Sequence, residues 1–262
     1  MMEKVIKKAP AKINLGLFVK KRRADGYHEI QTLFYPVRYM SDLLFFDYLP
    51  SERCEVEMNG LEEKVPLERN LCYKAWKLMS EIYPTVAGLH ISVSKNIPAG
   101  AGLGGGSSNA AATLKAVNEM YKLELSDEVL AGHAAQLGAD VAFFIYGKPM
   151  LGEGIGEKLE AWPLELRSWE IRLVTPEIHS STPAAYQGLD LSKISADRDL
   201  REVLNGPIES WKEDLVNDLE EPVMAQYPQI RELKELMYEK GAVYAAMSGS
   251  GSAVFGLFKR EW

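Results

Sequence analysis

The sequence has only two cysteines and four histidines among its 262 residues, and acidic residues outnumber basic ones. Cys54 and Cys72 form no CxxC pair and no cluster with histidine, which argues against a disulfide framework or a structural zinc site and indicates a reducing compartment. The formal net charge of −7 argues against nucleic-acid binding, because phosphate neutralisation normally requires a basic stripe. A local anion site is compatible with this charge.

Long apolar runs are also missing. No stretch of about 18 apolar residues is present to span a bilayer, and residues 1–12 lack the apolar core of a signal peptide. We therefore expect a cytoplasmic protein without a membrane partner, and nothing indicates an obligatory protein partner. With 47% hydrophobic and 26% charged residues, the length suits one large or two medium domains, and we favour two.

What the chain does contain is a concentration of glycine ahead of a predicted helix over residues 107–121. Glycine reaches positive φ at little cost, so successive N–H groups can converge on an anion, and the helix N-terminus adds its free N–H groups and dipole. The segment predicts a phosphate-binding loop. Its candidate residues are Pro98, Ala99, Gly100, Ala101, Gly102, Leu103, Gly104, Gly105, Gly106, Ser107 and Ser108. The two serine hydroxyls are suited to cap the helix and also to contact a phosphate or its Mg²⁺.

Other glycine-loop classes fit less well. Residues 100–105 formally match G-x-G-x-x-G, but a Rossmann loop follows a buried parallel strand, whereas the strand predicted here has His90, Ser92 and Ser94 on one face. A Walker A loop ends in Gly-Lys-Ser/Thr, and Gly106 is followed by two serines. Nicotinamide oxidoreductase, P-loop and protein-kinase chemistry are therefore disfavoured. A turn that only packs a helix against a sheet remains the structural alternative.

Hydrophobic periodicity indicates a mixed, α+β chain with mainly antiparallel strands. Strands are predicted over residues 12–19, 27–37, 43–47, 53–58, 89–95, 169–174, 242–247 and 253–258, and helices over 70–82, 107–121, 126–138 and 229–240, with weaker ones within 183–219. Lys12 and Asn14 project from the same face of the first strand. Asn59-Gly60 predicts a hairpin turn before Val65. The breaker-rich segment 147–156 predicts a hairpin or an interdomain crossing, and we place domains at 1–157 and 158–262.

Four segments together resemble the motif regions of the GHMP small-molecule kinases. They are Pro10-Ala-Lys-Ile-Asn-Leu-Gly16, the loop from Pro98 to Ser108, Leu137-Gly-Ala-Asp-Val141, and Ser248-Gly-Ser-Gly-Ser252. Within that superfamily, the segment from Arg23 to Leu33 together with Asn70-Leu71 resembles the kinases that act on 4-(cytidine 5'-diphospho)-2-C-methyl-D-erythritol. The resemblance implies an N-terminal domain like ribosomal protein S5 domain 2, a C-terminal ferredoxin-like domain and an active site in the cleft between them.

The implied reaction is transfer of the γ-phosphoryl group of ATP, with Mg²⁺, to a hydroxyl of the methylerythritol moiety. Asp140 matches the catalytic base and Lys12 its partner. A hydroxyl nucleophile needs a carboxylate to accept its proton, and a nearby ammonium keeps such a carboxylate ionised and stabilises developing charge. On residue type alone, Asp140 also suits a helix N-cap and Lys12 an exposed strand position.

The resemblance also assigns the substrate contacts. Tyr27 stacks on cytosine, His28 reads the edge of the base, and Tyr186 is the second aromatic residue. Further assignments place Asn14 at methylerythritol, Lys95, Asn70 and Leu71 beside adenine, and the loop containing Ser248, Gly249 and Ser250 over phosphate or acceptor. Without the resemblance, Tyr27 and His28 also suit the shoulder of a hairpin, and the last loop a strand turn.

Two departures from the family pattern are visible. Ala142 stands where many relatives have proline, and the chain ends at Trp262, where relatives continue with another helix and strand. We therefore expect an abbreviated C-terminal domain or a truncated chain. The competing functions are a GHMP kinase for homoserine, mevalonate or a sugar, and a nucleotide sensor without activity. Tyr27-His28 disfavours the former, and retention of both Lys12 and Asp140 disfavours the latter.

Overall fold

The computed structural model describes residues 4–60 and 65–260. Two compact units are present, and neither is one continuous stretch of chain. Unit 1 holds the residues up to Ala11, Pro36–Ala99 and Gly104–Lys148, whereas unit 2 holds Lys12–Tyr35, Gly100–Leu103 and the chain from Pro149 onward. The mixture of helices and strands confirms the α+β class. The domain boundary after residue 157 stays a prediction.

Two long strands, β1 (Val5–Arg22) and β2 (His28–Leu49), pair with each other and run from unit 2 into unit 1. They form the predicted hairpin, whose loop is closed by a hydrogen bond from the Arg23 N–H to the Tyr27 carbonyl. The separate strands predicted over 27–37 and 43–47 are wrong, because β2 is continuous. Its polar, exposed positions at Arg38 and Tyr39 interrupt the apolar alternation without breaking the strand.

Unit 1 has helices packed beside a small group of strands. The second half of β2 pairs antiparallel with β4, and β4 pairs in parallel with β3. Its other elements are β3 (Cys54–Asn59), η1 (Leu67–Arg69), α1 (Leu71–Ile82), β4 (Gly88–Ser94), α2 (Gly105–Met120), α3 (Asp127–Ala135) and α4 (Val141–Tyr146). The hairpin predicted at Asn59-Gly60 stays a prediction, and Val65 itself lies outside the strands of the described residues. Residues 61–64, also part of that prediction, lie outside the described residues.

Side chains cap the starts of two helices in unit 1. The Asn70 side chain accepts the Cys72 N–H at the start of α1, and the Ser126 side chain accepts the Val129 N–H at the start of α3.

Cys54 and Cys72 are both free and buried, and burial raises the pKa of Cys72 to about 11. Within the described ranges, no helix is both long enough and apolar enough to cross a membrane.

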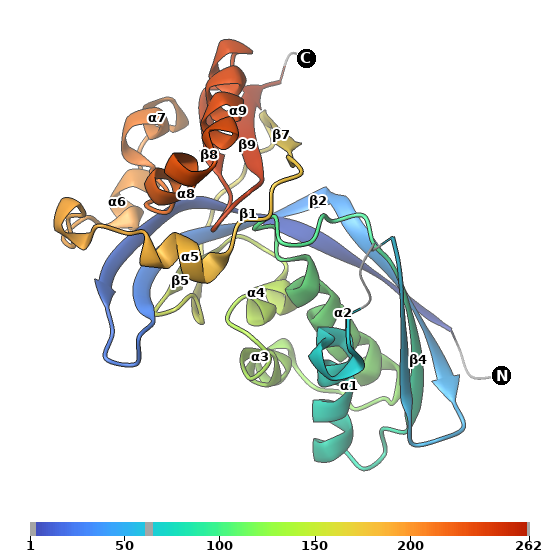
Figure 1. The fold of residues 1–262 in the computed structure, drawn as a ribbon. Coiled ribbons are helices and arrows are strands. Elements are labelled where there is room, and N and C mark those ends of the chain that lie inside the picture. Colours follow the sequence, from blue (N-terminus) through green and yellow to red (C-terminus); the bar gives the residue numbers. More distant parts are fainter. Residues whose placement is uncertain (1–3, 61–64, 261–262) are drawn as a thin grey trace. The chain divides into compact units, whose positions relative to one another are not determined.

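Unit 2 contains a second, three-stranded antiparallel sheet in the order β7-β9-β8, with α9 packed on β8 and β9 (Figure 1). The first half of β2 pairs with β5, which forms a hairpin with β6, so the breaker-rich segment is a hairpin. The elements are β5 (Met150–Glu153), β6 (Lys158–Ala161), β7 (Trp169–Val174), α5 (Thr182–Gln187), η2 (Leu191–Lys193), α6 (Leu200–Leu204), η3 (Ile208–Ser210), α7 (Trp211–Asp214), α8 (Glu220–Gln226), α9 (Pro228–Glu239), β8 (Tyr244–Met247) and β9 (Val254–Lys259).

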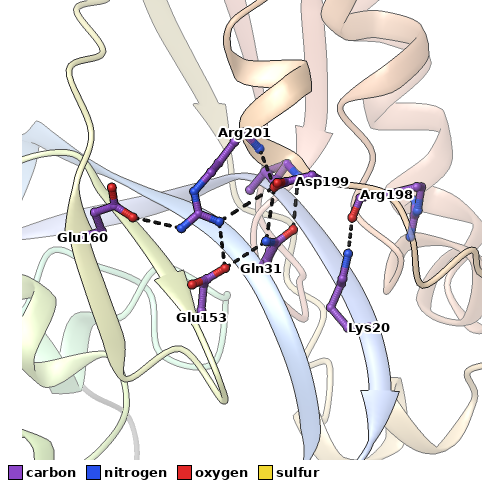
Figure 2. Close-up of polar contacts among 8 residues, drawn as sticks. Lys20, Gln31, Glu153, Glu160, Arg198, Asp199 and Arg201 are labelled. Atoms are coloured by element: carbon purple, nitrogen blue, oxygen red, sulfur yellow. Dashed lines mark hydrogen bonds and ion pairs between the residues drawn. The ribbon is translucent and has the colours of Figure 1, made fainter.

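A polar network joins the start of α6 to β2 and to the β5–β6 hairpin (Figure 2). The Arg201 guanidinium donates to Glu153 at 2.8 Å and to Glu160 at 2.9 Å. The Gln31 amide donates to Glu153 at 2.9 Å and to Asp199 at 3.2 Å, and its oxygen accepts the backbone N–H of Leu200. Segments that are distant in sequence are therefore held together by one guanidinium and one amide.

This network makes the stability of the protein depend on pH. Hydrogen bonds from Arg201 and Gln31 lower the pKa of Glu153 from 4.5 to about 2. Because the folded pKa is depressed, the stabilisation is present above about pH 4.5 and disappears as the pH falls toward 2. We expect Glu153→Gln to lower the melting temperature near neutral pH, and the difference from wild type to narrow with acidification. The exposed Glu165→Gln variant is the control. If the melting temperatures of Glu153→Gln and wild type differed by the same amount at all pH values, the depressed pKa of Glu153 would not be the cause.

Candidate active site

The glycine loop adopts the backbone conformation that the sequence predicts. Gly100, Gly102 and Gly104 have φ values of +69°, +76° and +71°. Gly104 is the N-cap residue of α2, so the interpretation of Ser107 and Ser108 as N-caps is wrong; both lie within the first turn of the helix. Glycine is favoured at this position because the N-cap residue has a left-handed backbone conformation, which serine adopts only at a steric cost.

The first turn of α2 has the features of an anion site. In the described part of the chain, no side chain caps its N–H groups, so these donors and the positive end of the helix dipole are available to a ligand. Ser108 is 1% exposed, and its hydroxyl oxygen has no hydrogen-bond partner among the described residues. A buried hydroxyl without a partner is unfavourable, and a bound phosphate would satisfy it.

The residues predicted beside adenine lie around this helix start. Leu71 is the first residue of α1, and a Cβ built on Gly106 would lie 3.5 Å from its Cδ1 atom. Asn70 uses its side-chain oxygen to cap α1. The Lys95 side chain is 6% exposed and forms an ion pair with Asp42. Pro98 and Ala99 precede the left-handed Gly100, and their part in the phosphate-binding loop stays a prediction.

Asp140 occupies the N-cap position of the short helix α4, but its side chain makes no capping hydrogen bond. The residue is half-buried, after a turn closed by the hydrogen bond from the Val141 N–H to the Gly138 carbonyl. The Asp140 carboxylate therefore does not act as the side-chain cap of α4 that its residue type suggested. A half-buried acid at a helix start is suited to proton transfer or to charge stabilisation.

In unit 2, Lys12 is buried rather than exposed. Its ammonium donates to Asn14 Oδ1 at 2.5 Å and to the Gly102 carbonyl at 2.8 Å, and it lies 5.6 Å from the centre of the Phe34 ring. Asn14 in turn donates to the Thr32 hydroxyl at 2.9 Å. The predicted projection of Lys12 and Asn14 from one strand face is thus confirmed, and Lys12 contacts the glycine loop at Gly102.

The second glycine–serine loop connects β8 and β9 and packs on residues 101–102. The Ser248 hydroxyl donates to the Gly102 carbonyl at 3.0 Å, and the Ala253 N–H donates to the Ala101 carbonyl at 3.1 Å. A Cβ built on Gly249 would lie 3.1 Å from Asn14 Oδ1 and 3.3 Å from Lys12 Nζ. Two loops that are 146 residues apart at this contact therefore meet at the adjacent carbonyls of Ala101 and Gly102.

The residues predicted to bind a base lie close together. The rings of His28 and Tyr186 stack, with centroids 5.0 Å apart and planes inclined by 20°. Burial, with a smaller contribution from Arg22, lowers the pKa of His28, so its imidazole is neutral at pH 7. Tyr27 is 62% exposed, and the Asp25 side chain accepts its backbone N–H. An exposed ring beside a neutral imidazole is suited to stack on a base and read its edge.

Comparison with known proteins gives a consistent result. Family models described as the GHMP kinases N terminal domain and the GHMP kinases C terminal match residues 70–148 and 199–261. A 4-diphosphocytidyl-2-C-methyl-D-erythritol kinase from Bacteroides fragilis is 44% identical over 253 residues, covering 96% of this chain and 91% of the relative. The chain belongs to this kinase family. The counterpart in Caldicellulosiruptor bescii is 38% identical, covering 97% and 90% of the two chains.

Solved structures agree with this assignment. A crystal structure of a 4-(cytidine 5'-diphospho)-2C-methyl-D-erythritol kinase aligns with a TM-score of 0.82 and 35% identity, covering 97% of this chain and 90% of that one. A homoserine kinase from Cytophaga hutchinsonii aligns with a TM-score of 0.77 over all of this chain and 87% of its own, but at 18% identity it shows a shared fold alone. The predicted GHMP kinase fold is confirmed.

The structure places several further residues beside the candidate site that were not found from the sequence. Thr182, at the start of α5, shares a 2.7 Å hydrogen bond with the Ser250 hydroxyl. The buried Asn217 amide donates to the carbonyls of Met247 and Gly249, and so fixes the backbone of the second loop. A Cβ on Gly100 would lie 2.5 Å from Nδ1 of His179, so this imidazole rests on the glycine loop. Thr32, which accepts a hydrogen bond from Asn14, is the one such residue that the sequence could have indicated, because it lies inside the segment from Arg23 to Leu33 that resembles the family.

The departure from the family at Ala142 has a simple structural context. Ala142 is the second residue of α4 and is 4% exposed. The first turn of a helix accepts either alanine or proline, because its N–H groups have no partner within the helix. The substitution is therefore compatible with the position of Asp140 at the start of the helix.

Proposed function

We propose that this chain transfers the γ-phosphoryl group of ATP to the 2-hydroxyl of 4-(cytidine 5'-diphospho)-2-C-methyl-D-erythritol, a step of isoprenoid synthesis. Membership of the kinase family supports the class of reaction and the acceptor. The geometric observation that carries the proposal is the Lys12 ammonium, which is buried and fixed on Asn14 and on the carbonyl of Gly102. A cation held against a phosphate-binding loop is suited to act on a transferring phosphoryl group.

In the proposed mechanism, Asp140 accepts the proton of the acceptor hydroxyl as the hydroxyl oxygen bonds to the γ-phosphorus. The bond from that phosphorus to the bridging oxygen of ADP breaks, and ADP leaves. Lys12 is the charge partner of Asp140 and stabilises the charge on the transferring group. Asn14, held by Thr32, orients the methylerythritol hydroxyl groups. Because this assignment needs no phosphorylated enzyme, both substrates are bound at the same time.

ATP fits the loop because its polyphosphate matches the donors of Gly104 to Ser108, including the Ser108 hydroxyl that has no partner within the described residues. Asn70, Leu71 and Lys95 border adenine. Mg²⁺ would neutralise the charge on the phosphates when bound with the nucleotide. In the part of the chain that the structure describes, no group of three or more His, Cys, Asp or Glu residues could hold a metal. Phosphate oxygens and the serine hydroxyls of the loop are the candidate ligands of Mg²⁺.

The cytidine end of the acceptor is assigned to Tyr27, His28 and Tyr186. The face of a stacked ring accepts any base, so discrimination for cytosine falls to the hydrogen bonds of His28. The loop at Ser248, Gly249 and Ser250 then covers the phosphates or the methylerythritol group. These roles are supported by the exposure of Tyr27 and by the stacking of His28 on Tyr186.

The test is ATP turnover with the cytidine acceptor set against homoserine, mevalonate and galactose. We expect ADP release with the cytidine compound alone, because the other acceptors offer nothing to the Tyr27, His28 and Tyr186 group. Turnover with one of the other acceptors would favour another GHMP kinase activity. ATP binding without release of ADP in the presence of any acceptor would favour a nucleotide sensor.

A further inference from the structure

A buried ion pair between Lys95 and Asp42 lies beside the glycine loop; Lys95 is assigned to the adenine site, but the proposed mechanism gives Asp42 no role. Asp42 lies within β2 and Lys95 immediately follows β4; their side chains are 0% and 6% exposed, and the Lys95 ammonium is bonded to the Asp42 carboxylate. Both charges lose their hydration here, so burial alone does not make such a pair stabilising. Its role is better sought in what it holds together.

The Asp42 carboxylate binds both ends of the loop. Its Oδ1 atom accepts the N–H groups of Asn96 at 2.7 Å and Ile97 at 2.9 Å, where the chain enters the loop. Its Oδ2 atom accepts the side-chain amide of Asn109 at 2.8 Å, in the second turn of α2 beyond the loop. Lys95 completes the cluster by donating to Asn109 Oδ1 at 3.1 Å. Donors on both sides of the loop therefore converge on one carboxylate.

The start of α2 also rests directly on this cluster. A Cβ built on Gly105 would lie 3.2 Å from Lys95 Nζ and 3.1 Å from Cγ2 of Ile97. The absence of a side chain at Gly105 thus lets the first helical turn approach the ion pair closely. Any displacement of the cluster would carry the helix start, and its N–H groups, with it.

We propose that Asp42 is a positioning residue for ATP, acting through the loop backbone rather than by touching the nucleotide. By fixing residues 96–97 and Asn109 to one carboxylate, it sets the separation of the loop ends and the direction of the N–H groups of Gly104 to Ser108. A glycine-rich segment without this constraint would lose more conformational entropy on binding a polyphosphate, and affinity would fall. The inference rests on the proposed function, because it requires ATP to occupy the loop.

The experiment compares Asp42→Asn and Asn109→Ala with wild type in full-length protein. We expect the KM for ATP and the dissociation constant of ADP, measured by calorimetry, to rise about tenfold, with the KM for the cytidine acceptor within about twofold of wild type. Asn109→Ala keeps the ion pair and serves if Asp42→Asn does not fold. Thr113→Val is the matched control, since Thr113 is equally buried one turn along α2 and its hydroxyl donates to a helix carbonyl instead.

The outcomes separate this inference from the proposed function. If wild type turns over and binds ADP, but both variants keep the nucleotide constants of wild type while losing thermal stability, Asp42 is only structural and the inference is overturned. If Thr113→Val weakens ADP binding as much as Asn109→Ala, the effect is a general one of helix packing and the inference is again overturned. If wild type binds no adenine nucleotide, the proposed function itself fails.

Discussion

Replacing Asp140 with asparagine is expected to lower kcat by about 10²–10⁴-fold, the usual contribution of a general base. The substitution preserves the shape of the side chain and removes its capacity to accept the hydroxyl proton. Asparagine is as good an N-cap residue as aspartate, so the start of α4 should keep its local conformation. The KM for ATP should stay within about twofold, because the phosphate donors belong to the loop and α2.

The measurement is steady-state kinetics with the cytidine acceptor, together with ADP binding and thermal melting of the same preparations. Asp127→Asn is the matched control, since Asp127 is an exposed acid at the start of the neighbouring helix α3. It should keep the wild-type kcat. A variant at Asp140 that retains kcat within a few-fold of wild type would remove this carboxylate from the mechanism.

Replacing Lys12 with methionine is expected to lower kcat by about 10²–10³-fold, the usual effect of removing one group that stabilises transition-state charge. Methionine keeps an unbranched apolar chain beside Phe34 in the buried strand, and so limits the loss of packing. The oxygens of Asn14 and Gly102 lose a donor, which we expect to cost about 1–3 kcal/mol of stability. The kinetic loss should persist where the variant is fully folded.

Lys20→Met is the control for this prediction. Lys20 lies on the same strand β1 and also uses its ammonium to hold a backbone carbonyl, that of Arg198, but it does not contact the glycine loop residues that Lys12 contacts. It should therefore lose stability and keep kcat. Equal losses of kcat in the two variants would indicate that Lys12 acts through the fold of β1 and not on the phosphoryl group.

The sequence predicts those parts of the fold that depend on neighbouring residues. Asn70 and Ser126 cap their helices, and Gly241, with φ of +92°, follows the end of α9. The strand predicted over 169–174 has the bounds of β7. Signals of this kind act within a few residues and need no partner from elsewhere in the chain.

The errors have a common cause in partners that are distant in sequence. The sequence did not predict the parallel pairing of β3 with β4, and β2 continues through its polar stretch because other strands pair with it at both ends. The same limit applies to the candidate site. Residue types indicated the phosphate loop, but not that Ser248 would bond to Gly102 or that Asp42 would pair with Lys95.

The carbonyl of Gly102 accepts hydrogen bonds from both Lys12 and Ser248, and a Cβ on Gly102 would lie 2.1 Å from the Ser248 carbonyl oxygen. A main-chain acceptor cannot be removed by any single codon change, whereas each of its two donors can. Substitution of Lys12 or Ser248 would therefore remove one donor and leave the other in place, whereas any side chain at position 102 would collide with the Ser248 carbonyl and push the two loops apart.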